Sequence, residues 1–457
     1  MEYNLNMLIR SILVILLLVT SYLPVHQTPD PFVVQFHPEG KLFVGDLVSM
    51  EVIPINEMNL EGKQVNIGFE GIDLAVTDFS NFGIDQREQA TLWWVLDTSE
   101  LKVGNHTLSF SMVPEGPTWD ETIRLYPQKE NPYLEAEWEI VNTDCCFLHY
   151  ISGTDAARDI ENLSLMVDKQ ADDVLDKLNT RLDKPINITF IPKLIGQGGF
   201  ASDGIYVSYF DGNITGDVTA QVIHHEMVHI LDDALGRGGK PTLLVEGLAV
   251  YLSNGHYKQE NLLTRAASLL PLDAYIPLED LLKDFYHQQH EISYLEAGAL
   301  IEFMVNQYGW DAFTKFFSII DINGDPGMGL EMAIIHEFDM DQDQLEQAFI
   351  NFLKTQESDE SSKNDLEMTI DFYDAIRLFQ QKLDPSTYFA TAWLPDGSTM
   401  QERGIVADFI RSRSEWDVYL MEYLLRTSSH LISDQEYQQA DWIIGLVNLI
   451  LNLYPIN

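Results

Sequence analysis

Cysteine is almost missing from this chain. Among 457 residues there are two cysteines, Cys145 and Cys146, and they are adjacent. Adjacent cysteines can close only a strained ring with each other, so the chain has no disulfide framework in the ordinary sense. They also lack the spacing of a cysteine-based zinc site. We expect two small buried residues in an apolar strand, and a stability that comes from packed cores.

Basic residues are scarce as well. Lys and Arg number 27 against 71 Asp and Glu, which gives a formal net charge of −44. Such a field repels phosphate backbones and anionic lipid headgroups, so nucleic-acid binding through a basic face is excluded. It favours neutral or cationic ligands without selecting a particular substrate. With 46% hydrophobic and 21% charged residues, the chain has the composition of a folded protein.

No hydrophobic run reaches the length of about 20 residues that a membrane helix needs. The apolar stretch over residues 7–19 is interrupted by Arg10 and Ser11. Its length fits the apolar segment of a secretory signal better than a membrane span. We therefore expect residues 1–28 to be a signal peptide or an uncleaved N-terminal membrane anchor. The protein is then secreted or held at the cell surface.

Short β-type runs separated by turn residues follow this segment. This spacing predicts an antiparallel, immunoglobulin-like β-sandwich over residues 32–128, and no motif within it suggests chemistry. The expected strands cover residues 32–36, 47–53, 64–69, 90–96, 106–113 and 122–125.

Helical periodicity begins near residue 155, so the protein is expected to be multidomain. A mixed α+β domain is predicted over residues 140–356, a polar linker over 357–365, and a helical C-terminal region over 366–457. Within the middle domain, β-type runs are expected at residues 186–191 and 205–210, and helices at 155–182, 217–235, 242–252, 293–308 and 311–319.

The pattern H-E-x-x-H occurs in the middle of one predicted helix, from His225 through Glu226 to His229. Residues i and i+4 of a helix lie on one face, so both imidazoles can reach a single zinc ion at about 2.0–2.1 Å. Glu226 then lies beside that ion. The five-residue pattern is only moderately specific, but its place in an apolar helix supports a metal site.

A catalytic zinc takes three protein ligands and leaves one position for water, so a third ligand is expected downstream. Glu246 stands in the apolar segment Leu244-Val245-Glu246-Gly247-Leu248-Ala249, 17 positions after His229. A turn between the two helices could fold the second against the first. A carboxylate in such a run is costly to bury without a partner, and zinc would be that partner. A helix cap or a surface position are the alternative interpretations of Glu246.

The H-E-x-x-H at His225 and the E-G-x-A that begins at Glu246 together resemble the gluzincin zinc metallopeptidases, in particular the peptidase MA-like domains. The resemblance covers residues 142–353, about half of the chain. It implies that His225, His229 and Glu246 bind Zn2+ and that Glu226 is the general base. The zinc would lower the pKa of a bound water toward about 7, and the resulting hydroxide would attack a peptide carbonyl.

One position departs from the pattern of some gluzincins. In those relatives an acidic residue one helical turn after the third ligand orients the first His, and here that position is Val250. The partner that fixes the tautomer of His225 is therefore unassigned, with Asp232 and Asp233 as candidates.

The oxyanion of the reaction needs a second stabilising group, and our candidate is Tyr294. The sequence from Ser293 to Glu296 has the form of a capping box, which would place Tyr294 on the first turn of a helix. In several gluzincins a Tyr on a helix after the glutamate helix has this role. A packing or surface role for Tyr294 is the alternative, and His256 and Tyr257 are weaker candidates.

The β-type run before the zinc helix has a role in the same comparison. Gluzincin-like domains use an edge strand here to pair with the substrate backbone, and Gly199-Phe200-Ala201 precedes such a strand. The chain lacks the G-x-M-E-N segment of the aminopeptidase branch. An endopeptidase acting on peptides or proteins is therefore favoured over an exopeptidase.

These observations predict an exported zinc metallopeptidase. The alternative is a catalytically inactive zinc-binding protein of the same fold that serves as an extracellular binding or scaffold protein. Glu226 argues against this alternative, because an inactive site has no evident need for a base beside the metal. Val250 argues for it. The sequence does not determine the oligomeric state or the substrate.

Overall fold

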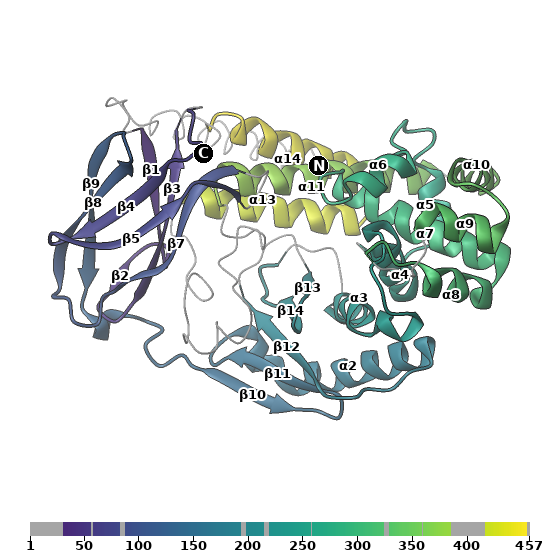
Figure 1. Ribbon diagram of the computed structural model, residues 1–457, viewed down its shortest axis with the longest axis horizontal. Helices are drawn as coiled ribbons and strands as arrows, with labels where there is room; N and C mark the ends of the chain where they lie inside the picture. Colours follow the sequence, from purple (N-terminus) through teal and green to yellow (C-terminus); the bar gives the residue numbers. More distant parts are fainter. Residues whose placement is uncertain are drawn as a thin grey trace, which may run out of the picture.

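The computed structural model describes residues 31–384 and 416–454, except for short gaps at 56–57, 83–86, 193–197, 214–218, 257, 324–328 and 359. A β module, an α/β unit with a helical half, and a set of C-terminal helices follow one another along the chain (Figure 1). The expected signal or anchor at 1–28 lies outside the described residues. Within the described ranges, no helix is long and apolar enough to cross a membrane.

The β module consists of two sheets that share one core. All strand pairs in it are antiparallel except β2 with β9. Side chains such as Val48 and Met50 from one sheet and Leu108 and Phe110 from the other are almost completely buried together. One sheet has the order β1 (Phe32–His37), β3 (Leu47–Pro54), β7 (Arg87–Asp97), β6 (Ser80–Phe82), and the other β2 (Leu42–Phe43), β9 (Thr118–Tyr126), β8 (Gly104–Val113), β4 (Gln64–Phe69), β5 (Ile72–Asp78).

Each of the six strands expected from the sequence falls inside one of these strands, because half-buried strands alternate apolar and polar residues in a way that the sequence shows directly. The short strands β2 and β6, and the exposed strand β5, were not expected. The immunoglobulin-like assignment of the module stays a prediction.

The α/β unit is built on a five-stranded sheet with the order β10-β11-β12-β14-β13. Helix α2 (Asp155–Leu178) connects the parallel strands β11 and β12, and buries one face that includes Leu163, Val167 and Val174. Helix α2 and the later helix α3 (Thr219–Leu231) pack against strands of this sheet. Its strands are β10 (Trp138–Asn142), β11 (Cys146–Ile151), β12 (Ile186–Ile191), β14 (Ile205–Ser208) and β13 (Gly199–Ala201).

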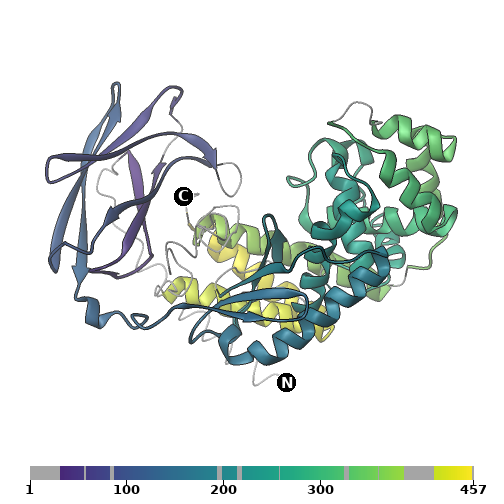
Figure 2. The ribbon, with the colours of Figure 1, turned by 60° about the horizontal axis from the view of Figure 1, so that its bottom comes forward.

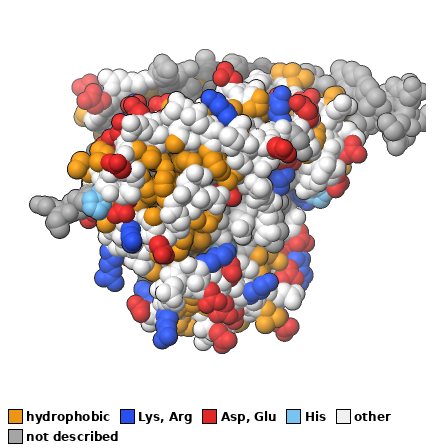
Figure 3. All heavy atoms as spheres, turned by 90° about the vertical axis from the view of Figure 1, so that its right-hand side faces the viewer, with side chains coloured by type: hydrophobic (Ala, Val, Ile, Leu, Met, Phe, Trp, Pro, Cys, Tyr) orange, Lys and Arg blue, Asp and Glu red, His pale blue; other side chains and the backbone are white. Residues whose placement is uncertain are grey.

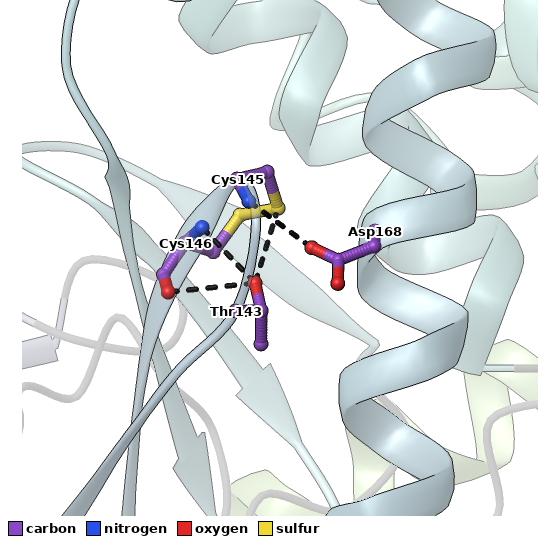
Figure 4. Close-up of a disulfide and its surroundings, with 4 residues drawn as sticks. All are labelled: Thr143, Cys145, Cys146 and Asp168. Atoms are coloured by element: carbon purple, nitrogen blue, oxygen red, sulfur yellow. Dashed lines mark hydrogen bonds between the residues drawn. A yellow bond between two sulfur atoms is a disulfide. The ribbon is translucent and has the colours of Figure 1, made fainter.

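Cys145 and Cys146 form a disulfide with each other at the start of β11, which corrects the expectation of two unlinked residues. They are buried, as expected. Figure 4 shows the bonds that surround the disulfide. The backbone N–H of Cys145 donates to Asp168 of α2, and that of Cys146 donates to Thr143. The disulfide joins two adjacent residues, so it brings no distant segments together. Rules that infer disulfides from the spacing of cysteines therefore do not detect it.

A small cluster joins the β module to this sheet. Leu47 of β3 and Trp94 of β7 pack against Ile191 of β12 and Tyr206 of β14. Phe200 of the edge strand β13 belongs to the same cluster, and its ring stacks on Tyr206 with the centroids 4.7 Å apart. The same cluster includes Trp138 of β10 and Ile151 of β11, so the β module contacts the sheet across several of its strands.

The helical half of the α/β unit follows β14, and its helices share one core with the sheet. Figure 3 views the end of the molecule formed by α8 (Trp310–Ile319), α9 (Leu330–Phe338) and α10 (Gln342–Leu353), where hydrophobic side chains gather with acidic and basic ones around them. The helices are α3 (Thr219–Leu231), α4 (Thr242–Ser253), α5 (Leu262–Ala267), α6 (Leu278–Lys283), α7 (His290–Tyr308), α8 (Trp310–Ile319), α9 (Leu330–Phe338) and α10 (Gln342–Leu353), with a 3₁₀ turn at Asp232–Leu235 after α3.

Helices α4 and α7 cross closely. A Cβ added to Gly247 of α4 would lie 2.6 Å from the Ala297 carbonyl oxygen, and one added to Gly298 of α7 would lie 2.4 Å from Val250 Cγ1. Because glycine has no side chain, α4 and α7 lie closer together at these two positions than they could with any other residue there. This crossing sets the position of α4 and of every side chain that it presents.

The C-terminal helices α11 (Glu360–Lys382), α13 (Trp416–Ser433) and α14 (Tyr437–Leu451) have a core of their own, and they lie between the β module and α8–α10 in both views (Figures 1 and 2). Helix α11 begins at Glu360, so most of the segment expected as a linker at 357–365 is helical. The domain boundaries themselves stay predictions. The polar residues of the segment at 357–365 suggested an exposed linker, but one of its acids, Asp365, is buried and forms ion pairs.

The ion pairs of Arg265 connect α11 to the helical half. Its guanidinium contacts Asp365 of α11 and lies 3.3 Å from the carboxylate of Glu291 of α7. Lys258 Nζ is 2.6 Å from the same Asp365 oxygen, and Thr369 accepts a further bond from Arg265. The Arg265 and Glu291 side chains are 5% and 0% exposed. A buried charge of this kind is tolerated only while its partners are present.

Replacing Arg265 by Met should lower the free energy of unfolding by about 3–5 kcal/mol, because Glu291 and Glu260 lose the guanidinium and Asp365 keeps only Lys258 and the Tyr437 hydroxyl. Urea unfolding followed by tryptophan fluorescence measures the change. The control is Arg181→Met at an exposed position, which should change stability by less than about 0.5 kcal/mol. Equal effects of the two variants would contradict this account.

Candidate metal centre

Helix α3 presents His225 and His229 on one face, four residues apart. Ile223, Met227 and Val228 of the same helix have no exposed surface and anchor it in the core. The edge strand β13 lies against α3, because a Cβ on Gly199 would be 2.5 Å from the Tyr206 carbonyl oxygen and 3.0 Å from Val222 of α3. The helix of the H-E-x-x-H motif is thus held between the core and the end of the sheet.

Helix α4 brings Glu246 to the same point. The chain turns back after α3 through Gly236, whose φ of 145° is rarely adopted by residues with a side chain. A Cβ there would also lie 2.6 Å from Ser318 Cα of α8. Helix α4 then starts at Thr242 and places Glu246, 6% exposed, opposite the two His.

His225, His229 and Glu246 form the candidate metal centre. Glu246 Oε2 lies 3.3 Å from His225 Nε2 and 3.2 Å from His229 Nε2, and the two Nε2 atoms are 3.1 Å apart. Three ligand atoms at tetrahedral angles, each about 2.0–2.1 Å from a zinc ion, would be about 3.3 Å from one another. The two imidazoles and the carboxylate therefore fit zinc in both donor type and spacing.

The charge of these groups also fits a cation. Burial is the largest influence on His225 and lowers its pKa to about 4. Burial opposes the charge of His229 too, but its contacts with Glu246 outweigh this and raise its pKa to about 9. Burial likewise opposes the charge of Glu246, yet the two His hold its pKa well below the usual range. Glu246 therefore stays ionised and draws a positive charge to the point where the three side chains meet.

Glu226 lies next to this centre and against the edge strand. Its carboxylate is 6% exposed and accepts a hydrogen bond from the backbone N–H of Ala201 in β13. Burial raises the pKa of Glu226 to about 8, and the nearby charge of Glu246 adds to the rise. A carboxyl group with a pKa in this range can both accept and donate a proton near neutral pH.

Tyr294 belongs to a group of packed rings next to the metal centre. Helix α7 begins at His290 with Gln289 as its N-cap, so the expected capping box at Ser293 is wrong and Tyr294 lies on the second turn. Its ring stacks on His256 at 4.0 Å between centroids and is 6.2 Å from the ring of His225. The expectation of a capping box was wrong because Gln289 caps the helix three residues before Ile292, by accepting the backbone N–H of Ile292. Tyr257 lies outside the described residues.

His256 links this group of rings to the Arg265 ion pairs. Its Nδ1 is 3.6 Å from Glu291 Oε2, while the other oxygen of Glu291 contacts Arg265. Its ring also meets His290, whose ring contacts Tyr373 of α11. The wall of the metal centre is thus continuous with the contact between α7 and α11.

Asp232 and Asp233 were the candidates for orienting His225, because the position at which some gluzincins have an acid is Val250 here. Val250 is fully buried and packs on Gly298, in a place where a carboxylate would be buried against a helix backbone. Asp232 follows α3, burial raises its pKa to about 6, and its charge contributes to the raised pKa of His229. Asp232 therefore acts on His229, the second histidine of the motif, while the charged groups that act on His225 are Glu246, His229 and His256.

Tyr286 was not anticipated. Its hydroxyl donates a 2.7 Å hydrogen bond to Glu246 Oε1, the carboxylate oxygen that faces away from the two His. Tyr286 lies between α6 and α7, in a segment without helical or strand periodicity. One tyrosine among 19 in such a segment carries no sequence signal for a site.

Comparisons with known proteins give little. No protein-family model matches the sequence, and no protein with a curated description does either. Among solved structures, an aminopeptidase N family protein from Idiomarina loihiensis is similar over 72% of this chain and 76% of that chain, with a TM-score of 0.31 and 9% identity. A likeness this distant carries no argument about activity. The function proposed below therefore rests on the site itself.

The purified protein should bind one zinc ion per chain, and His229→Ala should weaken binding by about 100-fold or more, since loss of a supporting partner alone costs 10- to 100-fold. Competition with a chromophoric chelator measures this affinity. His336→Ala, at an exposed histidine of α9, is the control and should bind zinc as the wild type does. Equal affinity of both variants would exclude His229 as a ligand.

Gly247→Ala should destabilise the protein by about 1–3 kcal/mol, because the new methyl group would force α4 away from the Ala297 carbonyl. Zinc affinity should fall with it, since Glu246 is the preceding residue. Gly445→Ala in α14 is a matched control with no atom within 4 Å of the new Cβ. It should stabilise by about 0.5–1 kcal/mol. Thermal unfolding with and without zinc tests whether the two effects have opposite signs.

Proposed function

We propose that this protein is an exported, zinc-dependent metallopeptidase of the gluzincin type, and that it hydrolyses peptide bonds within peptides or proteins. One observation carries the proposal: His225, His229 and Glu246 converge at the spacing of tetrahedral zinc ligands, with the carboxyl group of Glu226 buried beside them. The peptide substrate, the export through residues 1–28 and the immunoglobulin-like nature of the β module belong to the same proposal.

The roles of the residues follow from their positions. Zn2+, when bound, supplies a Lewis acid that acidifies water and polarises a carbonyl group. Glu226, with its raised pKa, accepts a proton from water and later donates it to the leaving amine. Tyr294 is proposed to stabilise the oxyanion through its hydroxyl. Burial holds the pKa of Tyr294 well above its usual range, so the hydroxyl keeps the proton that it must donate.

The edge strand β13 is proposed to hold the substrate. It ends the sheet, and its neighbour on one side is β14. An extended peptide can add to such an edge through backbone hydrogen bonds, which position a carbonyl group without reading the side chains. Because Ala201 of β13 donates to Glu226, a substrate on this edge lies beside the general base.

Replacing Glu226 by Gln tests the proposal on the full-length protein. The variant should bind zinc as the wild type does, and its kcat on quenched peptides or casein should fall by at least about 100-fold, because the proton acceptor is lost. Glu161→Gln at an exposed position of α2 is the control and should keep full activity. A variant as active as the wild type would disprove the role of Glu226.

A second outcome of the same experiment favours another function. If the wild type binds zinc and cleaves no member of a broad peptide library, the protein is a zinc-binding extracellular binding or scaffold protein. Val250, packed on Gly298 where some gluzincins have an orienting acid, is the observation that supports this alternative.

A further inference from the structure

The two oxygens of Glu246 have different partners. Oε2 faces the imidazoles of His225 and His229 at 3.3 and 3.2 Å. Oε1 accepts the hydroxyl of Tyr286 at 2.7 Å. The carboxylate is buried, so this division of its oxygens is set by protein groups and not by solvent.

Tyr286 reaches Glu246 from a loop that is itself anchored. The preceding residue, Phe285, is 4% exposed, and its ring packs edge-on against Tyr294 at 5.2 Å between centroids. Phe285 also meets the ring of Tyr286 edge-on at 5.6 Å. Tyr286 itself is 65% exposed, so its ring contributes little to the core. Its hydroxyl, in contrast, is bound to the buried acid of the centre, which indicates a role other than packing.

From this geometry we propose that Tyr286 is a positioning residue for the metal ligand Glu246, and that its hydrogen bond keeps Glu246 a one-oxygen ligand. This inference rests on the proposed zinc site.

The physical reason lies in what a carboxylate can do near a metal. A free carboxylate binds a cation through one oxygen or through both. A hydroxyl that donates to Oε1 occupies the lone pair that two-oxygen binding would use, and it draws that oxygen away from the centre. One-oxygen binding by Glu246 leaves the fourth tetrahedral position open, which a catalytic zinc needs for water or substrate. Partners of ligands in general change metal affinity by about 10- to 100-fold.

Tyr286→Phe is the test, because it removes the hydroxyl and keeps the ring. We expect the zinc dissociation constant, measured by chelator competition, to rise by about 10- to 100-fold. With Co2+ in place of zinc, the visible spectrum of the wild type should be the intense one of a four-coordinate ion. The variant should show the weaker bands of a five-coordinate ion, since both oxygens of Glu246 are then free to bind. A role in folding alone would not change this spectrum.

The matched control is Tyr275→Phe. Tyr275 donates a 3.1 Å hydrogen bond to the carboxylate of Glu346, so the variant removes the same chemical contact away from the metal centre. Its zinc affinity and cobalt spectrum should equal those of the wild type. Thermal unfolding of both variants in chelator checks that each is folded.

The outcomes separate this inference from the proposed function. Weaker zinc binding together with a changed cobalt spectrum, in Tyr286→Phe only, supports the positioning role. Wild-type zinc affinity and an unchanged spectrum in Tyr286→Phe overturn it and leave the zinc site intact. A wild-type protein that binds neither zinc nor cobalt overturns both.

Discussion

A carboxylate buried between two helices is the constraint on which the rest of this site depends. Glu246 is inside the protein, where a lone negative charge is costly, and it must be surrounded by groups that compensate it. Two imidazoles of α3 and a hydroxyl of the α6–α7 loop do so. Helix α4 can bring the carboxylate this close only because glycine stands at its crossing with α7. The close packing of α4 on α7 and the position of the metal ligand Glu246 therefore depend on the same glycines.

Helix α7 joins the site to the rest of the molecule. Glu291 in its first turn binds Arg265, which also holds Asp365 of α11, and Tyr294 one turn later belongs to the wall of the metal centre. In a chain with 27 basic residues and 71 acidic ones, Arg265 is one of the few cations, and it is buried where three helices meet. A shift of α11 would thus reach the wall of the site through contacts that are charged and tightly packed.

The sequence predicted those features of the fold and of the site that follow from short-range periodicity. Alternation revealed six strands of the β module, and the i, i+4 spacing of His225 and His229 together with an acid in an apolar run revealed the three converging side chains. Features that depend on tertiary contacts were missed. The contact of Tyr286 with Glu246 depends on the path of a loop, the early start of α7 on a glutamine cap, and the helix over the expected linker on the ion pairs of Asp365. The Tyr286 contact and the ion pairs of Asp365 have no period or local motif, and the cap of α7 is a local signal in competition with the one expected at Ser293.

The bond between Cys145 and Cys146 has a practical side. A disulfide acts on the unfolded chain through the loop that it closes, and this one closes no loop between separate segments. With two cysteines in the whole chain, refolding also offers no competing intrachain pairings. The disulfide does not link any two strands or helices of the core to each other. In a reducing host the protein would therefore lose no covalent link between distant segments, whereas small secreted domains depend on such links.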